Sequence, residues 1–183
     1  MTRNAQPATR YRSIVISGQI ASGTTTAART LAKEFGLDLH VAGEFFRKYF
    51  EEHHIPLAQK DKIPDEIDRQ IDKGLTDLAA SQKPVVIDAH YFGYFTRDMP
   101  HVLKVLLTCD DEVRYERAKS RISTFVETKQ DVKEREKGLD AKFRKLYADE
   151  NFLDPKFFDM IIDTTNTKPE EVAGKIANKF TSG

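Results

Sequence analysis

Cysteine is nearly missing from this chain of 183 residues, and tryptophan is missing altogether. A lone Cys109 cannot form a disulfide within the chain, and its place in an apolar run predicts a core residue of a protein from a reducing compartment. Net charge is missing too, because Lys plus Arg and Asp plus Glu number 29 each. No global field therefore favours nucleic acid or an acidic membrane surface, and an anion would have to bind at a local site.

Long hydrophobic runs are also missing. No stretch approaches the roughly 18 apolar residues that cross a membrane, and the polar segment 1–12 has no apolar core of a signal peptide. We therefore expect a cytoplasmic protein with a flexible lead-in at residues 1–12. We expect residues 13–183 to form a single domain, because a chain of this length can bury most of its surface as one unit.

The most informative segment is 13–26, an apolar strand that runs into a glycine loop and then a helix. It matches the phosphate-binding pattern G-x-x-x-x-G-K-[ST] except that threonine replaces the lysine. Glycines permit close approach and positive φ, so the loop and the helix N-terminus form a concave site for a polyphosphate. The residues of this site are Gly18, Gln19, Ile20, Ala21, Ser22, Gly23, Thr24, Thr25 and Thr26. The alternative is a turn that caps a helix without any ligand.

Apolar runs alternate with helical patterns along the rest of the chain. Strands are expected at 37–41, 85–88, 102–108 and 160–163, and helices at 44–53, 64–80, 111–121, 129–149 and 169–180. The alternation predicts an α/β fold with a parallel sheet, whose ligands bind beyond the carboxyl ends of the strands. Gly18, residues 42–47 and Asp88 all fall at such ends. Thr25 and Asp88 are then the expected Mg²⁺ partners, with a turn-capping role as the alternative for Asp88.

The chain resembles an archaeal-type cytidylate kinase over nearly its whole length. The resemblance rests on Gly-Thr-Thr-Thr at 23–26, Ala-Gly-Glu-Phe-Phe-Arg at 42–47 and Glu-Ile-Asp-Arg-Gln-Ile-Asp at 66–72. It continues through Val-Arg-Tyr-Glu-Arg at 113–117, Arg135-Glu136, and Asp-Met-Ile-Ile-Asp-Thr-Thr at 159–165. Threonine in place of the loop lysine is characteristic of this family. The resemblance implies a P-loop NTPase fold, a three-layer α/β/α sandwich with a helical acceptor-binding insertion near 42–80 and a lid near 117–150.

The resemblance also implies an activity, namely phosphoryl transfer from ATP, with Mg²⁺, to a nucleoside monophosphate such as CMP or dCMP. Positive charge that the loop lacks would come from lid arginines with a catalytic role, Arg117, Arg121, Arg135 and Arg144. The expected substrate-binding residues are Gly43, Arg47, Asp68, Arg69, Asp88, His90 and Arg97. The expected partner is a small nucleotide rather than nucleic acid or a membrane, and the expected state is a monomer, with an oligomer as the alternative.

Several of these residues have plainer explanations. Arg47 has the forked donors that suit a phosphate, whereas Asp68 and Arg69 lie on a charged helix that a solvated face explains equally well. The lid arginines could form an exposed basic face. An aromatic cluster could stack on a base or pack in the core, and it comprises Tyr91, Phe92, Tyr94 and Phe95.

The sequence departs from the family after the third strand, where Ala89-His90 replaces Gly-Arg. An arginine that would grip the acceptor is thereby missing, and Arg97 is the candidate to reach back in its place. Two alternatives therefore stay open. One is a kinase of the same fold with a different nucleotide or small-molecule acceptor, and the other is a nucleotide-binding regulatory protein that has lost turnover.

Overall fold

The computed structural model describes residues 10–56, 59–120 and 127–183. Within them, five parallel strands form one sheet in the order β2-β3-β1-β4-β5. The strands are β1 (Ser13–Gly18), β2 (Asp38–Val41), β3 (Val85–Asp88), β4 (Val102–Thr108) and β5 (Met160–Asp163). The central position of β1 places the loop that follows it in the middle of one sheet edge.

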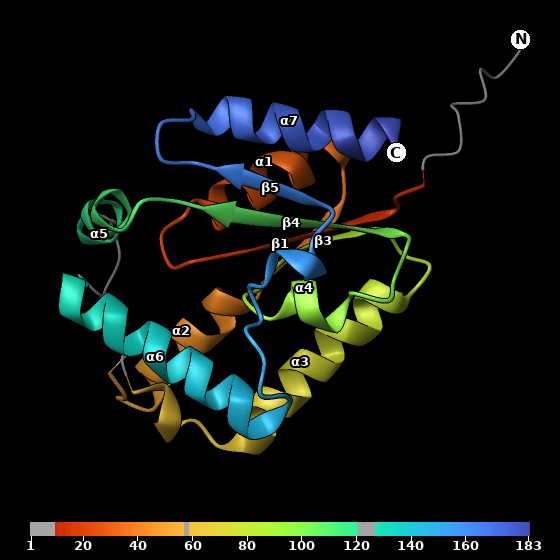
Figure 1. The fold of residues 1–183 in the computed structure, drawn as a ribbon. Coiled ribbons are helices and arrows are strands. Elements are labelled where there is room, and N and C mark those ends of the chain that lie inside the picture. Colours follow the sequence, from red (N-terminus) through yellow and green to blue (C-terminus); the bar gives the residue numbers. More distant parts are fainter. Residues whose placement is uncertain (1–9, 57–58, 121–126) are drawn as a thin grey trace, which may run out of the picture.

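Helices cover both faces of this sheet (Figure 1). They are α1 (Thr24–Phe35), α2 (Ala42–Glu52), α3 (Asp65–Ala80), α4 (Phe92–Phe95), α5 (Asp111–Lys119), α6 (Lys129–Leu146) and α7 (Pro169–Ser182), with 3-10 turns η1 (Lys60–Lys62) and η2 (Pro155–Phe157). The α1 and α7 helices lie on one face, and α3, α4 and α6 lie on the other. The predicted three-layer α/β/α sandwich is confirmed.

Alternation along β1 explains the two cores. Ile14 and Ile16 point into a cluster with Leu31 of α1 and Ile176 of α7, whereas Val15 points to the opposite face. Successive side chains of a strand face opposite ways, and burial on both faces explains why β1 reads as a continuous apolar run. Each core therefore fixes one layer of helices against the same strand.

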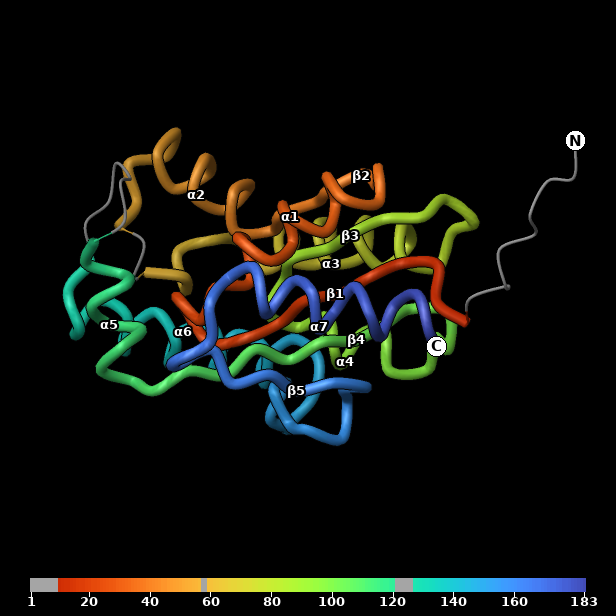
Figure 2. The backbone as a smooth tube through the Cα atoms, turned by 90° about the horizontal axis from the view of Figure 1, so that it is seen from above, coloured from red at the N-terminus to blue at the C-terminus, as the bar shows by residue number. Residues whose placement is uncertain are grey.

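The carboxyl ends of the strands share one edge, because all pairs are parallel. Asp88 at the end of β3 is in register with Ile16 of β1 and with Val41 of β2. Figures 1 and 2 show α2 and α5 near this edge and the C-terminus at the opposite end of the molecule. The loop after β1, the start of α2 and Asp88 are thus brought together as expected.

Residues 10–12 differ from the flexible lead-in that we expected over 1–12. Tyr11 is buried, the Arg12 amide donates to the His101 carbonyl at 2.8 Å, and the Arg12 guanidinium donates to the Ser81 carbonyl at 2.9 Å. These contacts make residues 10–12 part of the domain, and residues 1–9 lie outside the described part of the chain. Among the described helices, none combines the length and apolar character needed to span a membrane.

Candidate active site

The loop between β1 and α1 has the backbone that a phosphate site needs. A Cβ on Gly18 would lie 2.6 Å from the Leu107 carbonyl oxygen and 2.5 Å from the Ser22 Oγ, so only glycine fits there. Gly23 has a φ of 96°, in the left-handed region that glycine adopts freely. The chain then enters α1 at Thr24, and the free N–H groups and positive dipole end of this helix attract an anion.

Thr25 and Asp88 lie together beside this loop. The Thr25 hydroxyl donates to Asp88 Oδ2 at 2.5 Å, and Asp88 is buried at the end of β3. Hydroxyl and carboxylate oxygens are the ligand types that Mg²⁺ prefers, and Mg²⁺ keeps several waters besides them. No cluster of three or more acidic, histidine or cysteine ligands occurs among the described residues. The pair therefore fits a metal that is completed by phosphate oxygens and water.

Ser22 gives a second indication that a ligand belongs in the loop. Its Oγ is buried and has no hydrogen-bond partner among the described residues, which is costly unless a ligand or water supplies one. The Ser22 carbonyl is fixed from outside, because the Thr164 hydroxyl at the end of β5 donates to it at 2.8 Å. The loop thus fits a polyphosphate both in its backbone and in this hydroxyl.

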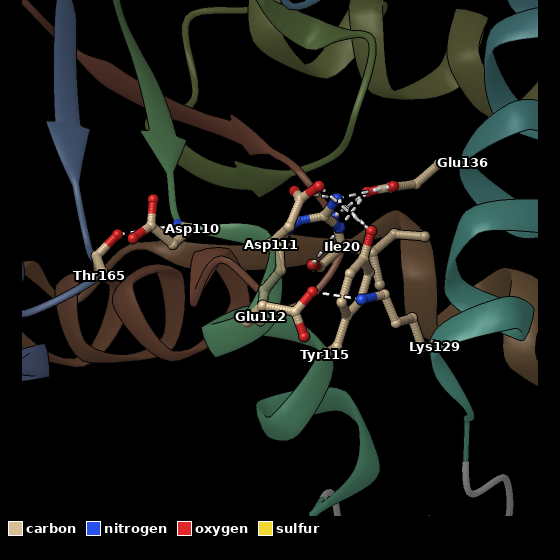
Figure 3. A network of polar contacts seen from close by, with 9 residues as sticks. Ile20, Asp110, Asp111, Glu112, Tyr115, Lys129, Glu136 and Thr165 are labelled. Atoms are coloured by element: carbon tan, nitrogen blue, oxygen red, sulfur yellow. Dashed lines mark hydrogen bonds and ion pairs between the residues drawn. The ribbon is translucent and has the colours of Figure 1, made fainter.

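A buried ion pair joins the loop to α5 and α6 (Figure 3). The Arg114 guanidinium contacts both carboxylate oxygens of Glu136, at 2.6 and 3.0 Å, and also Asp111 at 2.8 Å. Glu136 in turn accepts the Ile20 amide at 3.3 Å. A two-point arginine–carboxylate contact has a fixed geometry, so α6 is held against the loop.

A pocket opens between α2, α3 and α6, and we call it the α2–α6 pocket. It is lined by Ala42, Gly43, Phe46, Arg47, Phe50, Lys60, Asp72, Ala89, His90, Tyr91, Arg135 and Leu139. Burial lowers the pKa of Arg47, and the neighbouring Arg135 guanidinium lowers it further. Two guanidinium groups that line one pocket, with Arg135 near enough to lower the pKa of the half-buried Arg47, favour an anion between them. The His90 Nδ1 lies 2.9 Å from the Gly18 carbonyl oxygen, so the pocket adjoins the loop.

The other end of this pocket carries Lys60 and Asp72. Both side chains are buried, and burial raises the pKa of Asp72 to about 6 and lowers the pKa of Lys60 to about 8. Asp72 Oδ2 accepts a hydrogen bond from the Tyr147 hydroxyl at 2.7 Å. Perturbed groups in a pocket indicate a functional site.

The solvated-face explanation for α3 is wrong for Asp68 and Asp72, which are buried. Asp68 is fully buried, where it pairs with Lys60 and lies 3.3 Å from the Lys142 ammonium. It does not line the α2–α6 pocket, so its place fits a buried ion cluster that ties η1 and α6 to α3. Arg69 is exposed, as a solvated face would have it.

A second hollow lies on the other side of the loop, and we call it the α5–α7 hollow. It is lined by Ala21, Ser22, Gly23, Thr26, Ala27, Leu107, Arg117, Ser120, Thr164, Thr167, Pro169 and Val172. Arg117 is held here, because its guanidinium donates to the Thr164 carbonyl at 2.7 Å and contacts Cys109 Sγ at 3.3 Å. Cys109 is buried, as its apolar surroundings predicted.

Other predicted site residues lie elsewhere. Arg144 is surface-exposed and pairs with Asp140 and Asp149, and neither hollow includes it. Arg97 lies over the Tyr94 ring, 4.1 Å from its centroid, and lines a separate hollow with Lys104 and Lys156. The structure therefore does not bring Arg97 to the missing arginine's place. Arg121 lies outside the described residues.

The aromatic cluster after β3 packs as core. Tyr91 lies edge-on to Phe152, with ring centroids 4.9 Å apart, and its hydroxyl donates to the Leu139 carbonyl at 2.9 Å. Sequence reasoning missed three polar residues of the site, Lys60, Asp72 and Glu136, as functional candidates. Asp72 and Glu136 fall within the family-like segments, whereas Lys60 has no signal in the sequence around it.

Comparisons with known proteins place the chain in a family. A protein-family model described as an AAA domain (AAA_18) matches residues 14–138. The chain is 35% identical to a cytidylate kinase of Pyrococcus abyssi, over 87% of this chain and 88% of the relative. It is 34% identical to a cytidylate kinase of Ignicoccus hospitalis, over 89% and 95%.

Solved structures show the same fold at low identity. A gluconokinase from Sinorhizobium meliloti 1021 matches with a TM-score of 0.65 and 15% identity, over 94% of this chain and 93% of that chain. A shikimate kinase from Aquifex aeolicus matches with a TM-score of 0.52 and 18% identity, over 91% and 94%. The family model and the curated relatives both span most of the domain, and the chain belongs to the archaeal-type cytidylate kinase family of P-loop kinases.

Proposed function

We propose that this protein transfers a phosphoryl group from ATP to CMP or dCMP. The observation that carries the proposal is the meeting of two anion sites at one sheet edge. The loop after β1 adjoins the α2–α6 pocket, and His90 bridges them through the Gly18 carbonyl. Two adjacent sites for phosphate groups are what transfer from one nucleotide to another requires.

The loop side suits ATP. The N–H groups of 18–26 would hold the phosphates, and Thr25 and Asp88 would hold the metal that the kinase family uses. When bound, Mg²⁺ supplies positive charge to the phosphate oxygens. The α5–α7 hollow adjoins the loop at Ser22 and Gly23, which gives room for the nucleoside of ATP beside Arg117.

The pocket side suits the acceptor phosphate. Gly43 at the start of α2 makes room for Arg47, because a Cβ on Gly43 would lie 3.3 Å from Arg47 Nη1. Arg135 reaches the same pocket from α6, where Glu127 holds its guanidinium at 2.7 Å. In this proposal residues 42–80 bind the acceptor, residues 117–150 act as the lid, and Arg47 and Arg135 orient and neutralise the transferred group.

Lid arginines divide between the two sides in this proposal. Arg117 serves the ATP side and Arg135 the acceptor side, in keeping with the hollow that each lines. Arg144 would have to leave its surface ion pairs with Asp140 and Asp149 to reach a phosphate.

The test is a panel of acceptors. ADP release from MgATP would be measured with CMP, dCMP, UMP, AMP or GMP at one concentration, beside a reaction without acceptor. The highest turnover is expected with CMP or dCMP. A peak with another acceptor would favour the same-fold alternative, which Ala89-His90 motivates. Measurable ATP binding with no turnover for any of these acceptors would contradict the proposed transfer to CMP or dCMP, and would favour a different small-molecule acceptor or a regulatory role.

A further inference from the structure

Asp72 is the one carboxylate among the described residues that line the α2–α6 pocket. The other charged groups of this pocket are Arg47, Lys60 and Arg135. A phosphate explains the two arginines, but it would be repelled by a carboxylate. Asp72 therefore calls for a part of the ligand that donates a hydrogen bond.

Neighbouring residues restrict how Asp72 can turn. The Tyr147 hydroxyl donates to Oδ2 at 2.7 Å, and no described residue donates to Oδ1. Tyr147 is itself fixed by Phe95, whose ring centroid lies 4.9 Å away. Since the pKa of Asp72 is about 6, the group is largely ionised at neutral pH and acts only as an acceptor. One carboxylate oxygen is thus held by the protein, and the other is available to a ligand.

Nucleobases differ in what they would present to such a group. Cytosine carries an amino donor at C4, whereas uracil carries a carbonyl acceptor at the same place. Cytosine also has a ring acceptor, N3, beside the amino group. Lys60 lies near Asp72 in the same pocket and can donate there. A carboxylate beside an ammonium complements the edge of cytosine, and it opposes the carbonyl of uracil.

We propose that Asp72 is the specificity-determining residue of the α2–α6 pocket, and that its carboxylate accepts a hydrogen bond from the 4-amino group of cytosine. This inference rests on the proposed function. If the base carries a carbonyl at C4, or has no amino group there, the buried carboxylate has no hydrogen-bond donor from the ligand, and binding is weakened. Sites that hydrogen-bond a substrate group reject analogues without it far more strongly than apolar pockets do.

The first experiment is the variant Asp72→Asn, which replaces a hydrogen-bond-accepting carboxylate oxygen by a hydrogen-bond-donating NH₂ group. If the carbonyl of the introduced amide takes the hydrogen bond from Tyr147, its NH₂ group faces the base and matches the carbonyl of uracil. We expect the ratio of kcat/KM for CMP to that for UMP to fall roughly 100-fold, with KM for ATP nearly unchanged. Asp77→Asn is the matched control, because Asp77 is an exposed residue of α3 that pairs with Lys73, and its ratio should equal that of the wild type.

The second experiment changes the ligand instead of the protein. The monophosphate of 2-pyrimidinone riboside has hydrogen where CMP has the 4-amino group. Wild-type kcat/KM should fall roughly 100-fold from CMP to this analogue. The Asp72→Asn variant should show little difference between the two. Loss of discrimination in the variant alone is a result that a structural role of Asp72 would not produce.

The outcomes distinguish a failure of the proposed role of Asp72 from a failure of the proposed kinase activity. Wild-type protein that phosphorylates no nucleotide at all would overturn the proposed function before any variant is made. Wild-type protein that uses CMP but also uses the analogue equally well would overturn the inference alone. The same holds if a folded Asp72→Asn variant keeps the wild-type ratio of CMP to UMP. If the variant does not fold, the wild-type comparison still tests whether the 4-amino group is recognised, and equal kcat/KM values for CMP and the analogue overturn the inference.

Discussion

Arg47 lies half-buried in the α2–α6 pocket and forms no ion pair with a described carboxylate. Glu44, Asp88 and Glu127 lie near enough to influence its pKa, but the effects of burial and of Arg135 outweigh them and lower it. A half-buried guanidinium without an ion-pair partner can bind an anion without first breaking a contact to a carboxylate. Arg144, by contrast, lies on the surface and already forms ion pairs with two carboxylates.

Replacing this guanidinium by an apolar side chain should show what it does. We expect Arg47→Met to lower kcat/KM for the acceptor by roughly 100- to 1,000-fold, because a positioned donor to the transferred group is lost. The control is Lys48→Met, which removes an exposed charge next to it on α2. Initial rates with varied CMP and saturating MgATP measure the effect. Normal kinetics in Arg47→Met would contradict the acceptor role.

At the scale of elements, α6 links the parts of the site. Its start is fixed by a capping box between Thr128 and Asp131. The successive residues Arg135 and Glu136 then reach different targets, the α2–α6 pocket and the Ile20 amide of the loop. Further along, the Lys142 ammonium donates to the Ile63 carbonyl at 2.6 Å. One helix therefore sets the position of the loop relative to the pocket.

The ion pair at the loop end of α6 can be tested by Glu136→Gln. The amide keeps the shape but loses the charge that faces the buried Arg114, so we expect the free energy of unfolding to fall by about 1–3 kcal/mol. We also expect KM for ATP to rise, since the Ile20 amide is less firmly held. Glu134→Gln changes an exposed residue of the same helix as a control. Urea unfolding and ATP-dependent rates are the measurements, and equal values in both variants would refute the link.

Asp72 on α3 should make stability depend on pH. Its pKa rises from 3.8 to about 6 in the folded protein, mainly through burial, with Asp68 raising it and Lys60 and Tyr147 opposing. Between these values the folded state holds a proton that the unfolded state has released, so raising the pH through this window destabilises the fold. Asp72→Asn lacks this titration.

The comparison of the two proteins isolates that group. From pH 4 to pH 7.5 the free energy of unfolding of Asp72→Asn should gain about 2 kcal/mol relative to the wild type, as the two pKa values of 3.8 and about 6 imply. Urea titrations at several pH values would measure the gain. If the free energies of unfolding of Asp72→Asn and the wild type differ by the same amount at every pH in this range, burial does not raise the pKa of Asp72.

The elements were largely predictable from the pattern of apolar residues, and the exceptions have physical reasons. Strands β3, β4 and β5 have the predicted bounds, because long-range pairing and the apolar runs coincide there. The α4 helix was not predicted, since four residues carry too little periodicity to be recognised. The α2 helix begins at Ala42, two residues earlier than predicted, because no polar cap marks its start.

On the scale of the whole molecule, tertiary packing decides which predicted site residues meet. The loop, Thr25, Asp88 and Arg47 meet because parallel strands end at one edge, which the sequence implies. Lys60 lies in a segment without a recognisable pattern, and only the packing of η1 against α3 and α6 brings it to the pocket. Arg97 was expected to reach back, but α4 carries it away toward the start of β4.

The start and end of the described chain also meet in the fold. The Arg10 amide donates to the Gly183 carbonyl at 2.6 Å, and Tyr11 is buried in the core that α7 covers. Removal of this side chain by Tyr11→Ala should cost about 3 kcal/mol and lower Tm by roughly 6–12 °C. Arg10→Ala keeps the backbone contact and should change Tm little. Thermal unfolding followed by circular dichroism tests both, and equal Tm values for the two variants would contradict this role.

Thr24 at the start of α1 has a consequence for chemical regulation. Residues 18–26 contain no primary amine, so acetylation or any other amine-directed modification has no target within the phosphate loop. Kinases with a lysine in this place expose their loop to such chemistry. Lysine acylation could therefore act on this site only through lysines that lie outside residues 18–26.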